Sequence, residues 1–200
     1  MIEKHDARIG KIHARLTALH TRLREAGYEF ADPEAALPGT GPSVQAALAK
    51  IENAVGPIPL TLRLFYERIG SVDFTGFHPA WHGCEYPDPI VVFAVEDAAT
   101  ELEDYLYDPA AYVATFGSFR LPIAPDYLHK SDVSGGMWYG IAVPGQEPDP
   151  PLLEEWHHTT FLDYLEIAIR FGGFPGLERC PDHNWPIARL NRGLPLSICV

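Results

Sequence analysis

The apolar residues of the first segment recur with the period of one helical face. Their separations of three and four positions match the a and d positions of a heptad and predict a helix over 2–26. Gly27 follows directly and is expected to close that helix in a left-handed cap. The seam is short for a free coiled coil. We therefore expect it to pack on its own domain, with a homodimer through this helix as the alternative. The seam residues are Ile9, Ile12, Leu16, Leu19 and Leu23.

Two further helices are predicted on either side of the sequence Gly-Pro-Ile-Pro. Apolar residues at helical spacing predict the first over 43–55, with Ser43 as its N-cap, after a turn-rich connector at 28–42. Gly-Pro stops this helix, and Pro59 can occupy the first turn of the next, where its missing N–H costs nothing. The second helix is expected to end at Gly70. The residues that characterise this elbow and the helix after it are Gly56, Pro57, Pro59, Phe65, Tyr66 and Gly70.

Beyond Gly70 the pattern changes to short apolar runs separated by turns, which predict strands. Between them, an acidic helix is predicted over 96–107, with Leu106 among its inward residues. A last helix is predicted over 161–171, with Thr160 as its N-cap. The expected strands are 71–77, 89–95, 120–124, 137–143 and 151–156.

This order of helices and strands predicts an α+β fold with one main domain. A chain of 200 residues is long enough to bury one sizeable core. We expect the domain to span 43–175, after the N-terminal helix at 1–27 and the connector at 28–42. Residues 176–200 are expected to form a tail that packs on the domain.

The distribution of charge narrows the choice of partners. The chain has 15 basic and 27 acidic residues and a net charge of −12. Between Ile69 and Phe119 there is no Lys or Arg, although acidic residues are frequent. Such a surface repels phosphate backbones, which argues against nucleic-acid binding. It would accelerate encounter with a basic partner protein, and solubility alone is the alternative explanation.

The sequence also indicates the cellular compartment in which the protein is expected. No apolar run approaches the roughly 20 residues that a membrane span needs, and charged residues stand near the N-terminus where a signal peptide is apolar. A cytoplasmic protein without membrane contact is expected. The three cysteines are an odd number and lie far apart in the chain. Reduced thiols are therefore expected.

A loop rich in aromatic residues, histidine and cysteine at 77–86 is the first candidate for chemistry. Zinc needs about four nitrogen or sulfur ligands in a tetrahedral array. The candidate ligands are loosely spaced, so we expect no metal and no cofactor, and packing of the loop on its own aromatic residues is favoured. The candidate ligands are His78, His82, Cys84, Cys180 and His183.

No serine or cysteine stands in the context of an activated nucleophile. We therefore predict no catalytic residue and no enzymatic activity. The same aromatic loop can instead be a binding surface, because Trp and Tyr bury a large area with few rotamers to freeze. Packing of its aromatic residues onto the domain is the equally weighted alternative. The predicted contact residues are Trp81, Glu85, Tyr86, Asp88, Glu101, Glu103 and Asp104.

The order of elements, together with a few short motifs, resembles the SUKH superfamily, which includes fungal cell-wall-assembly regulators and bacterial immunity proteins. Gly56-Pro57-Ile58-Pro59 is similar to the family's Leu-Pro elbow, although Ile58 stands where the family has Leu. Ile69-Gly70 replaces the usual Asn-Gly at the end of the next helix, and Leu121-Pro122-Ile123-Ala124 is similar to a family strand.

The resemblance implies a domain in which helices pack on a strongly bent, mostly antiparallel sheet. It also implies a non-enzymatic role, in which the protein binds a toxin domain, often a basic one, and neutralises it. A regulatory or scaffold protein of the same fold with another partner is the first alternative. A small metal-dependent enzyme that uses His78, His82 and Cys84 is the second.

Overall fold

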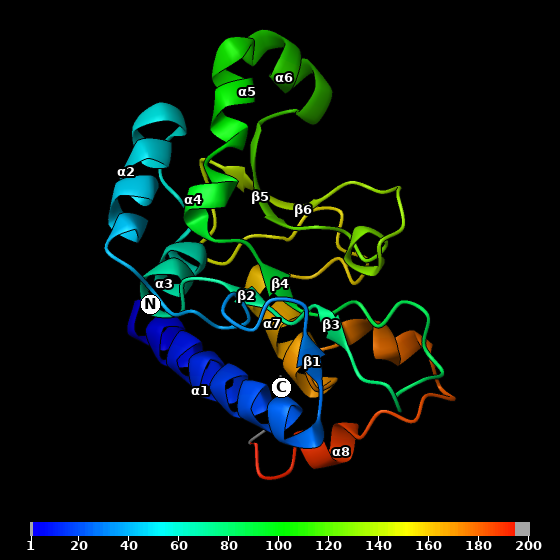
Figure 1. Ribbon diagram of the computed structural model, residues 1–200. Coiled ribbons are helices and arrows are strands. Elements are labelled where there is room, and N and C mark those ends of the chain that lie inside the picture. The colour runs from blue at the N-terminus through cyan, green and yellow to red at the C-terminus, as the bar shows by residue number, and fades with distance from the viewer. Residues whose placement is uncertain (1, 195–200) are drawn as a thin grey trace.

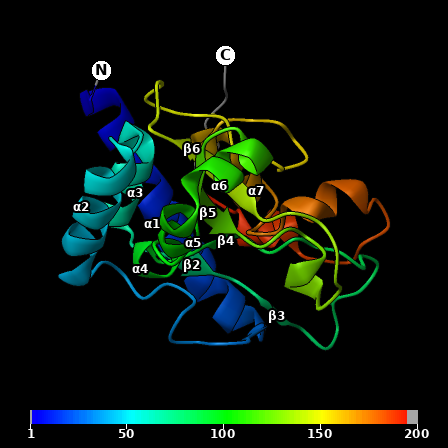
Figure 2. The same ribbon diagram turned by 90° about the horizontal axis from the view of Figure 1, so that it is seen from above.

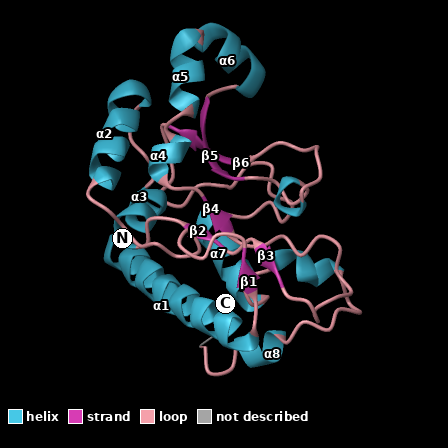
Figure 3. Ribbon diagram, viewed as in Figure 1, coloured by secondary structure: helices cyan, strands magenta, loops and turns pink. Residues whose placement is uncertain are grey.

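The computed structural model describes residues 2–194. It combines helices with three small antiparallel sheets of two strands each, which confirms the α+β class (Figures 1 and 3). Within the described part of the chain, every helix is too short or too polar to cross a bilayer.

The N-terminal helix α1 (Ile2–Ala26) forms one side of the molecule (Figure 1). All of its predicted seam residues are fully buried, and the helix packs on α3 (Leu60–Arg68) and α7 (Phe161–Arg170). Arg8 adds ion pairs to two carboxylates of α7. The seam is therefore used within the chain, as expected, and Gly27 adopts the predicted left-handed conformation.

The elbow joins α2 (Ser43–Val55) to α3. The two helices have nearly the predicted bounds, and Phe65 and Tyr66 are fully buried. Ser43 was expected to cap α2, but Pro42 holds the N-cap position and no side chain caps the helix. Gly70 is required where α3 ends, because its φ is +88° and a Cβ there would lie 2.2 Å from the Gly39 carbonyl oxygen.

The predicted strand 120–124 is confirmed as part of β5, and the other strands are shorter than the sequence predicts. The run 71–77 divides into two strands in different sheets, and the run 89–95 contributes only two paired residues. The expected strand 151–156 is wrong, since only isolated bridges form there. The pairs are β1 (Glu29–Phe30) with β3 (Gly76–Phe77), β2 (Val72–Asp73) with β4 (Val91–Val92), and β5 (Phe119–Ala124) with β6 (Tyr139–Val143).

The predicted acidic helix is two helices, α4 (Val95–Ala98) and α5 (Glu101–Tyr107), and a further helix, α6 (Pro109–Phe116), follows. Helices α5 and α6 form a hairpin that projects from the top of Figure 1 and contacts β5 (Figure 2). Leu106 was expected to point inward, but it is exposed. Leu106 lies one turn after the buried Leu102 on the same face of α5, so its exposure comes from its place at the projecting end of the helix rather than from the helical phase.

The chain after β6 returns to the core. Thr160 caps α7, because its hydroxyl accepts a hydrogen bond from the Asp163 N–H, as predicted. After α7, the segment to Leu194 contains the short helices η2 (Pro175–Arg179) and α8 (Ile187–Leu190), and it buries Leu177 and Leu190. The loop between β5 and β6 holds another short helix, η1 (His129–Ser131).

Candidate functional site

The residues that the sequence singles out for partner binding lie in two separate places. Trp81, Glu85 and Tyr86 belong to the loop after β3, at the lower right of Figure 1. The acidic residues at 101, 103 and 104 lie on α5 at the top of the molecule. The structure therefore does not join them into one contact surface.

Asp88 is a correction to the predicted contact residues. Its side chain is 0% exposed and accepts a hydrogen bond of 2.6 Å from the ammonium of Lys130, whose side chain is also 0% exposed. Trp156 Nε1 donates to the second oxygen of the same carboxylate at 3.4 Å. Asp88 is thus a buried partner in an ion pair and cannot contact another protein.

Aromatic rings enclose this ion pair. The Lys130 ammonium lies 4.8 Å from the ring centre of Tyr139 and within 3.4 Å of the Tyr164 hydroxyl. Burial, and then the negative charge of Asp88, raise the pKa of both phenols well above the usual value. The tyrosines therefore stay neutral, and the cluster joins the loop that contains η1 to α7 as a structural element.

A second charged cluster lies beside the first. His157 Nδ1 is 2.5 Å from the carboxylate of the buried Glu155, and its Nε2 is 3.1 Å from Glu178. Burial lowers the pKa of His157, but the hydrogen bonds and charge of the two carboxylates outweigh burial and raise it overall. The histidine connects the loop before α7 to η2.

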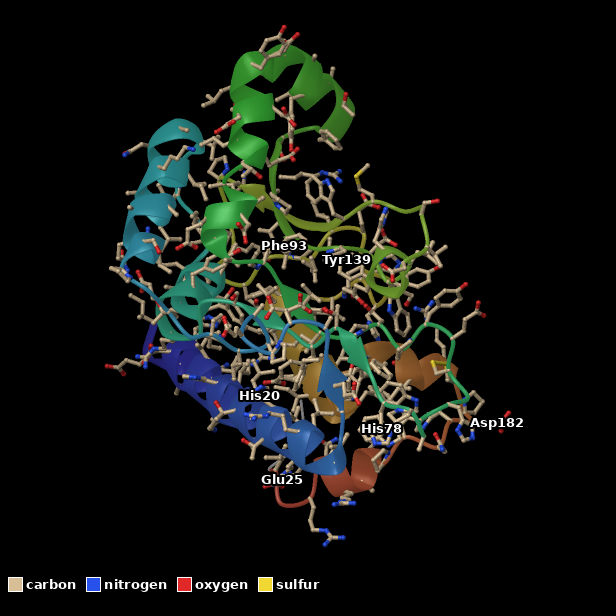
Figure 4. The ribbon with its side chains drawn as sticks, in the orientation of Figure 1. His20, Glu25, His78, Phe93, Tyr139 and Asp182 are labelled. Atoms are coloured by element: carbon tan, nitrogen blue, oxygen red, sulfur yellow. A yellow bond between two sulfur atoms is a disulfide. The ribbon has the colours of Figure 1, made fainter. Side chains whose placement is uncertain are left out.

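The aromatic loop packs largely on the protein itself. Trp81 stacks on His78 at 4.3 Å between ring centres and also contacts Tyr28 and Trp185. His78 is labelled in Figure 4. Its Nε2 is 3.0 Å from the carbonyl oxygen of Ala26. Trp81 is therefore only half-exposed, whereas Glu85 is exposed.

The cysteines contradict the expectation of reduced thiols. Cys84 and Cys180 form a disulfide across 96 residues of sequence, visible near the labelled Asp182 in Figure 4. This bond uses both cysteines among the candidate metal ligands. Within residues 2–194, no three His, Cys, Asp or Glu side chains converge in a metal-binding arrangement. The sequence could not show this pairing, because it depends on the folded position of the tail. Cys199 lies outside the described residues.

The hairpin of α5 and α6 is the most exposed apolar feature of the described chain. Tyr107 is 92% exposed, Leu106 54% and Val113 41%. Leu102 and Tyr112 are buried and anchor the hairpin in the core. Single exposed apolar residues are common on protein surfaces, but a group of them on one projecting element indicates an interaction site.

The same hairpin carries concentrated negative charge. Glu103 and Asp104 are exposed on α5, and Asp108 is exposed between the helices, where it also caps α6. The Lys50 ammonium lies 3.9 Å from Glu103, but both side chains are more than half exposed, so this pair neutralises little of the field. The hairpin therefore presents carboxylates beside an apolar tip. The acidic charge in the sequence pointed to α5 as a contact region. The sequence did not lead us to predict α6 or the exposed apolar residues at the tip.

A groove of about 600 Å³ separates the aromatic loop from the loop that contains η1. Phe77, Trp81 and Trp185 line one part of it, and His129 and Asp132 line another. Its volume is within the range of small-molecule sites. His78 also lines the groove. Both of its ring nitrogens are hydrogen-bonded within the chain, Nε2 with the Ala26 carbonyl oxygen and Nδ1 with the Ala80 N–H.

Comparison of the chain with protein-family models, with curated proteins and with solved structures finds no match. The resemblance to the SUKH superfamily therefore stays a prediction from short motifs.

Proposed function

We propose that this chain is a non-enzymatic protein-binding domain whose α5–α6 hairpin binds a basic polypeptide and neutralises it. In this proposal it is an immunity protein of the SUKH type that acts in the cytoplasm on a toxin domain. The observation that carries the proposal is the set of exposed apolar residues on the hairpin, with Leu106 and Tyr107 at its tip and Val113 on α6, beside the carboxylates of α5.

The chemistry of the hairpin defines the partner. Tyr107 offers a large side chain with two rotatable angles, which loses little entropy when it enters a pocket. The surrounding carboxylates favour a surface of Lys and Arg and would steer such a partner toward the tip. The expected partner surface is an apolar pocket bordered by cations, such as the substrate cleft of an enzyme that acts on a polyanion.

The binding test is co-expression of the chain with the toxin domain encoded by the neighbouring reading frame, followed by purification and a binding assay. Replacement of Tyr107 by Ala is expected to weaken binding about thirtyfold or more, the effect of losing a hot-spot residue. Phe77→Ala is the matched control, because Phe77 is also aromatic and 58% exposed but lies on β3, away from the hairpin. Equal affinity of the Tyr107 variant and the unchanged protein would refute the role of the hairpin.

Charge reversal tests the second element of the proposal. Glu103→Lys with Asp104→Lys is expected to lower the association rate roughly tenfold at low salt and to reduce its dependence on ionic strength. Glu25→Lys with Glu34→Lys is the control, because it makes the same change in net charge at two exposed acidic sites outside the hairpin. An association rate that responds equally to both changes would show that only net charge matters.

A regulatory or scaffold protein with a different basic partner is the alternative, and the hairpin supports it equally well. The two are distinguished by growth: an immunity protein restores the growth of cells that express the toxin domain, whereas a scaffold does not. Failure to rescue growth and to form a complex would end the immunity proposal.

A further inference from the structure

Two irregular segments far apart in the chain hold each other at the edge of the molecule. They are residues 79–85, after β3, and residues 180–185, between η2 and α8. Figure 4 shows them meeting near Asp182, and Gly83 passes so close that a Cβ would lie 2.8 Å from the Asp182 carbonyl oxygen. We name this pair of segments the clasp.

Asn184 supplies the polar contacts of the clasp. The His82 N–H donates to Asn184 Oδ1 at 2.7 Å, the Asn184 N–H donates to the His82 carbonyl at 3.2 Å, and Asn184 Nδ2 donates to the Ala80 carbonyl at 2.8 Å. Both Asn184 and His82 are exposed. Water competes for such hydrogen bonds, so their net contribution to holding the segments is small.

Trp81 and Trp185 also pack on each other across the clasp, with 5.0 Å between ring centres, and the disulfide is the covalent link between the two segments. Cys84 and Cys180 are each half-exposed, so a small thiol can reach the bond. Trp81 and Cys84 also form part of the wall of the groove, together with Trp185. A change in the clasp consequently changes one side of that groove.

We propose that the Cys84–Cys180 disulfide is a redox-sensitive clasp, whose reduction releases residues 79–85 and 180–185 and opens the groove without unfolding the domain. In the reaction a dithiol reductant gives two electrons and two protons to the two sulfurs and leaves as its own disulfide. A disulfide oxidant closes the clasp by the reverse exchange. A reducing cytoplasm keeps the clasp open, and oxidation closes it.

The clasp and the hairpin lie at different ends of the molecule (Figure 1), so the hairpin can fail as a binding site while the clasp holds, and the reverse. The test uses Cys199→Ser protein, in which the two clasp cysteines are the remaining thiols. Thiol titration of the folded protein should find neither thiol after treatment with a disulfide oxidant and both after subsequent treatment with dithiothreitol.

Hydrogen exchange measured by mass spectrometry then locates the opening. After reduction, amide exchange in peptides that contain His82 or Asn184 should accelerate roughly tenfold or more, as local opening predicts. Peptides from α3 and α7 should not change. The double variant Cys84→Ser/Cys180→Ser should show the same faster exchange without reductant. If that variant does not fold, the comparison of oxidised and reduced Cys199→Ser protein still tests the proposal.

Three results would overturn the proposal. Unchanged exchange after reduction would mean that Asn184 and packing hold the segments without the disulfide. Acceleration throughout α3 and α7 would make the disulfide a staple of the whole fold. Full thiol reactivity before reduction, persisting after treatment with a disulfide oxidant, would mean that the bond does not form.

Discussion

The buried pair of Lys130 and Asp88 allows a quantitative prediction about what holds the core together. Both side chains are 0% exposed and 2.6 Å apart. The substitution Lys130→Met keeps most of the volume and removes the charge, which leaves the carboxylate buried without its cation. Breaking a buried pair in this way costs about 3–5 kcal/mol. For a chain of this size we therefore expect a melting temperature lower by about 6–20 °C.

The converse substitution, Asp88→Asn, leaves the ammonium without its anion and should cost a similar amount. Asn is chosen because residue 88 has a φ of +52°, a conformation that Asn tolerates better than other side chains. The double variant has no unpaired charge. Its cost should therefore fall below the sum of the single costs by about 2 kcal/mol or more.

Urea unfolding followed by circular dichroism measures all of these free energies, provided that the slope with denaturant stays the same across the variants. The reasoning is refuted if each single variant loses less than about 1 kcal/mol. It is also refuted if the two single costs add in the double variant, because additivity would mean that the charges do not interact.

Other contacts make narrower predictions. The raised pKa of His157 means that its pairing stabilises the fold fully below pH 6.5, the ordinary pKa of the side chain, and that this stability is lost as pH rises through the higher folded pKa. In urea titrations across this range His157→Gln should remove that slope, and an unchanged slope would contradict the assignment. Gly117 has a φ of +79° and no atom within 4 Å of a Cβ, so Gly117→Ala should cost about 1–2 kcal/mol. Gly70→Ala should cost about 3 kcal/mol or more, because the Gly39 carbonyl blocks the added methyl; equal melting temperatures would disprove the steric conflict. Thr160 caps α7 and donates to Asp149 at 2.8 Å. Thr160→Ala should therefore cost about 1–2 kcal/mol, Thr160→Ser much less, and equal losses in thermal unfolding would argue against the cap.

The sequence predicted those helices whose signals lie in neighbouring residues of the chain. Helix α1 has an uninterrupted apolar seam, and α7 has a capping threonine before its apolar stripe, so both were recognised from neighbouring residues alone. Helix α6 was missed although its signals are present: Asp108 as N-cap, Pro109 in the first turn and Gly117 after the end. Its outer face is apolar, and this obscured the helical period.

Features that depend on tertiary contacts could not be predicted in the same way. The apolar run at 89–95 predicts a strand, but only Val91 and Val92 pair with β2, which is itself two residues long, and Val95 already belongs to α4. The candidate site was predicted only in part, because some of its residues depend on contacts with distant parts of the chain. The acidic residues of α5 were identified from charge, whereas Asp88 was misplaced because its partner lies 42 residues away in the chain.

The way in which the hairpin is attached separates its surface from the stability of the fold. Leu102 and Tyr112 fix it against the core, while the tip residue Tyr107 and the outward positions 103 and 104 pack on nothing that the fold requires. Substitutions at these outer positions alter shape and charge at little cost in folding free energy. The same scaffold can therefore acquire new specificities through changes confined to residues 101–116, with the rest of the sequence left intact.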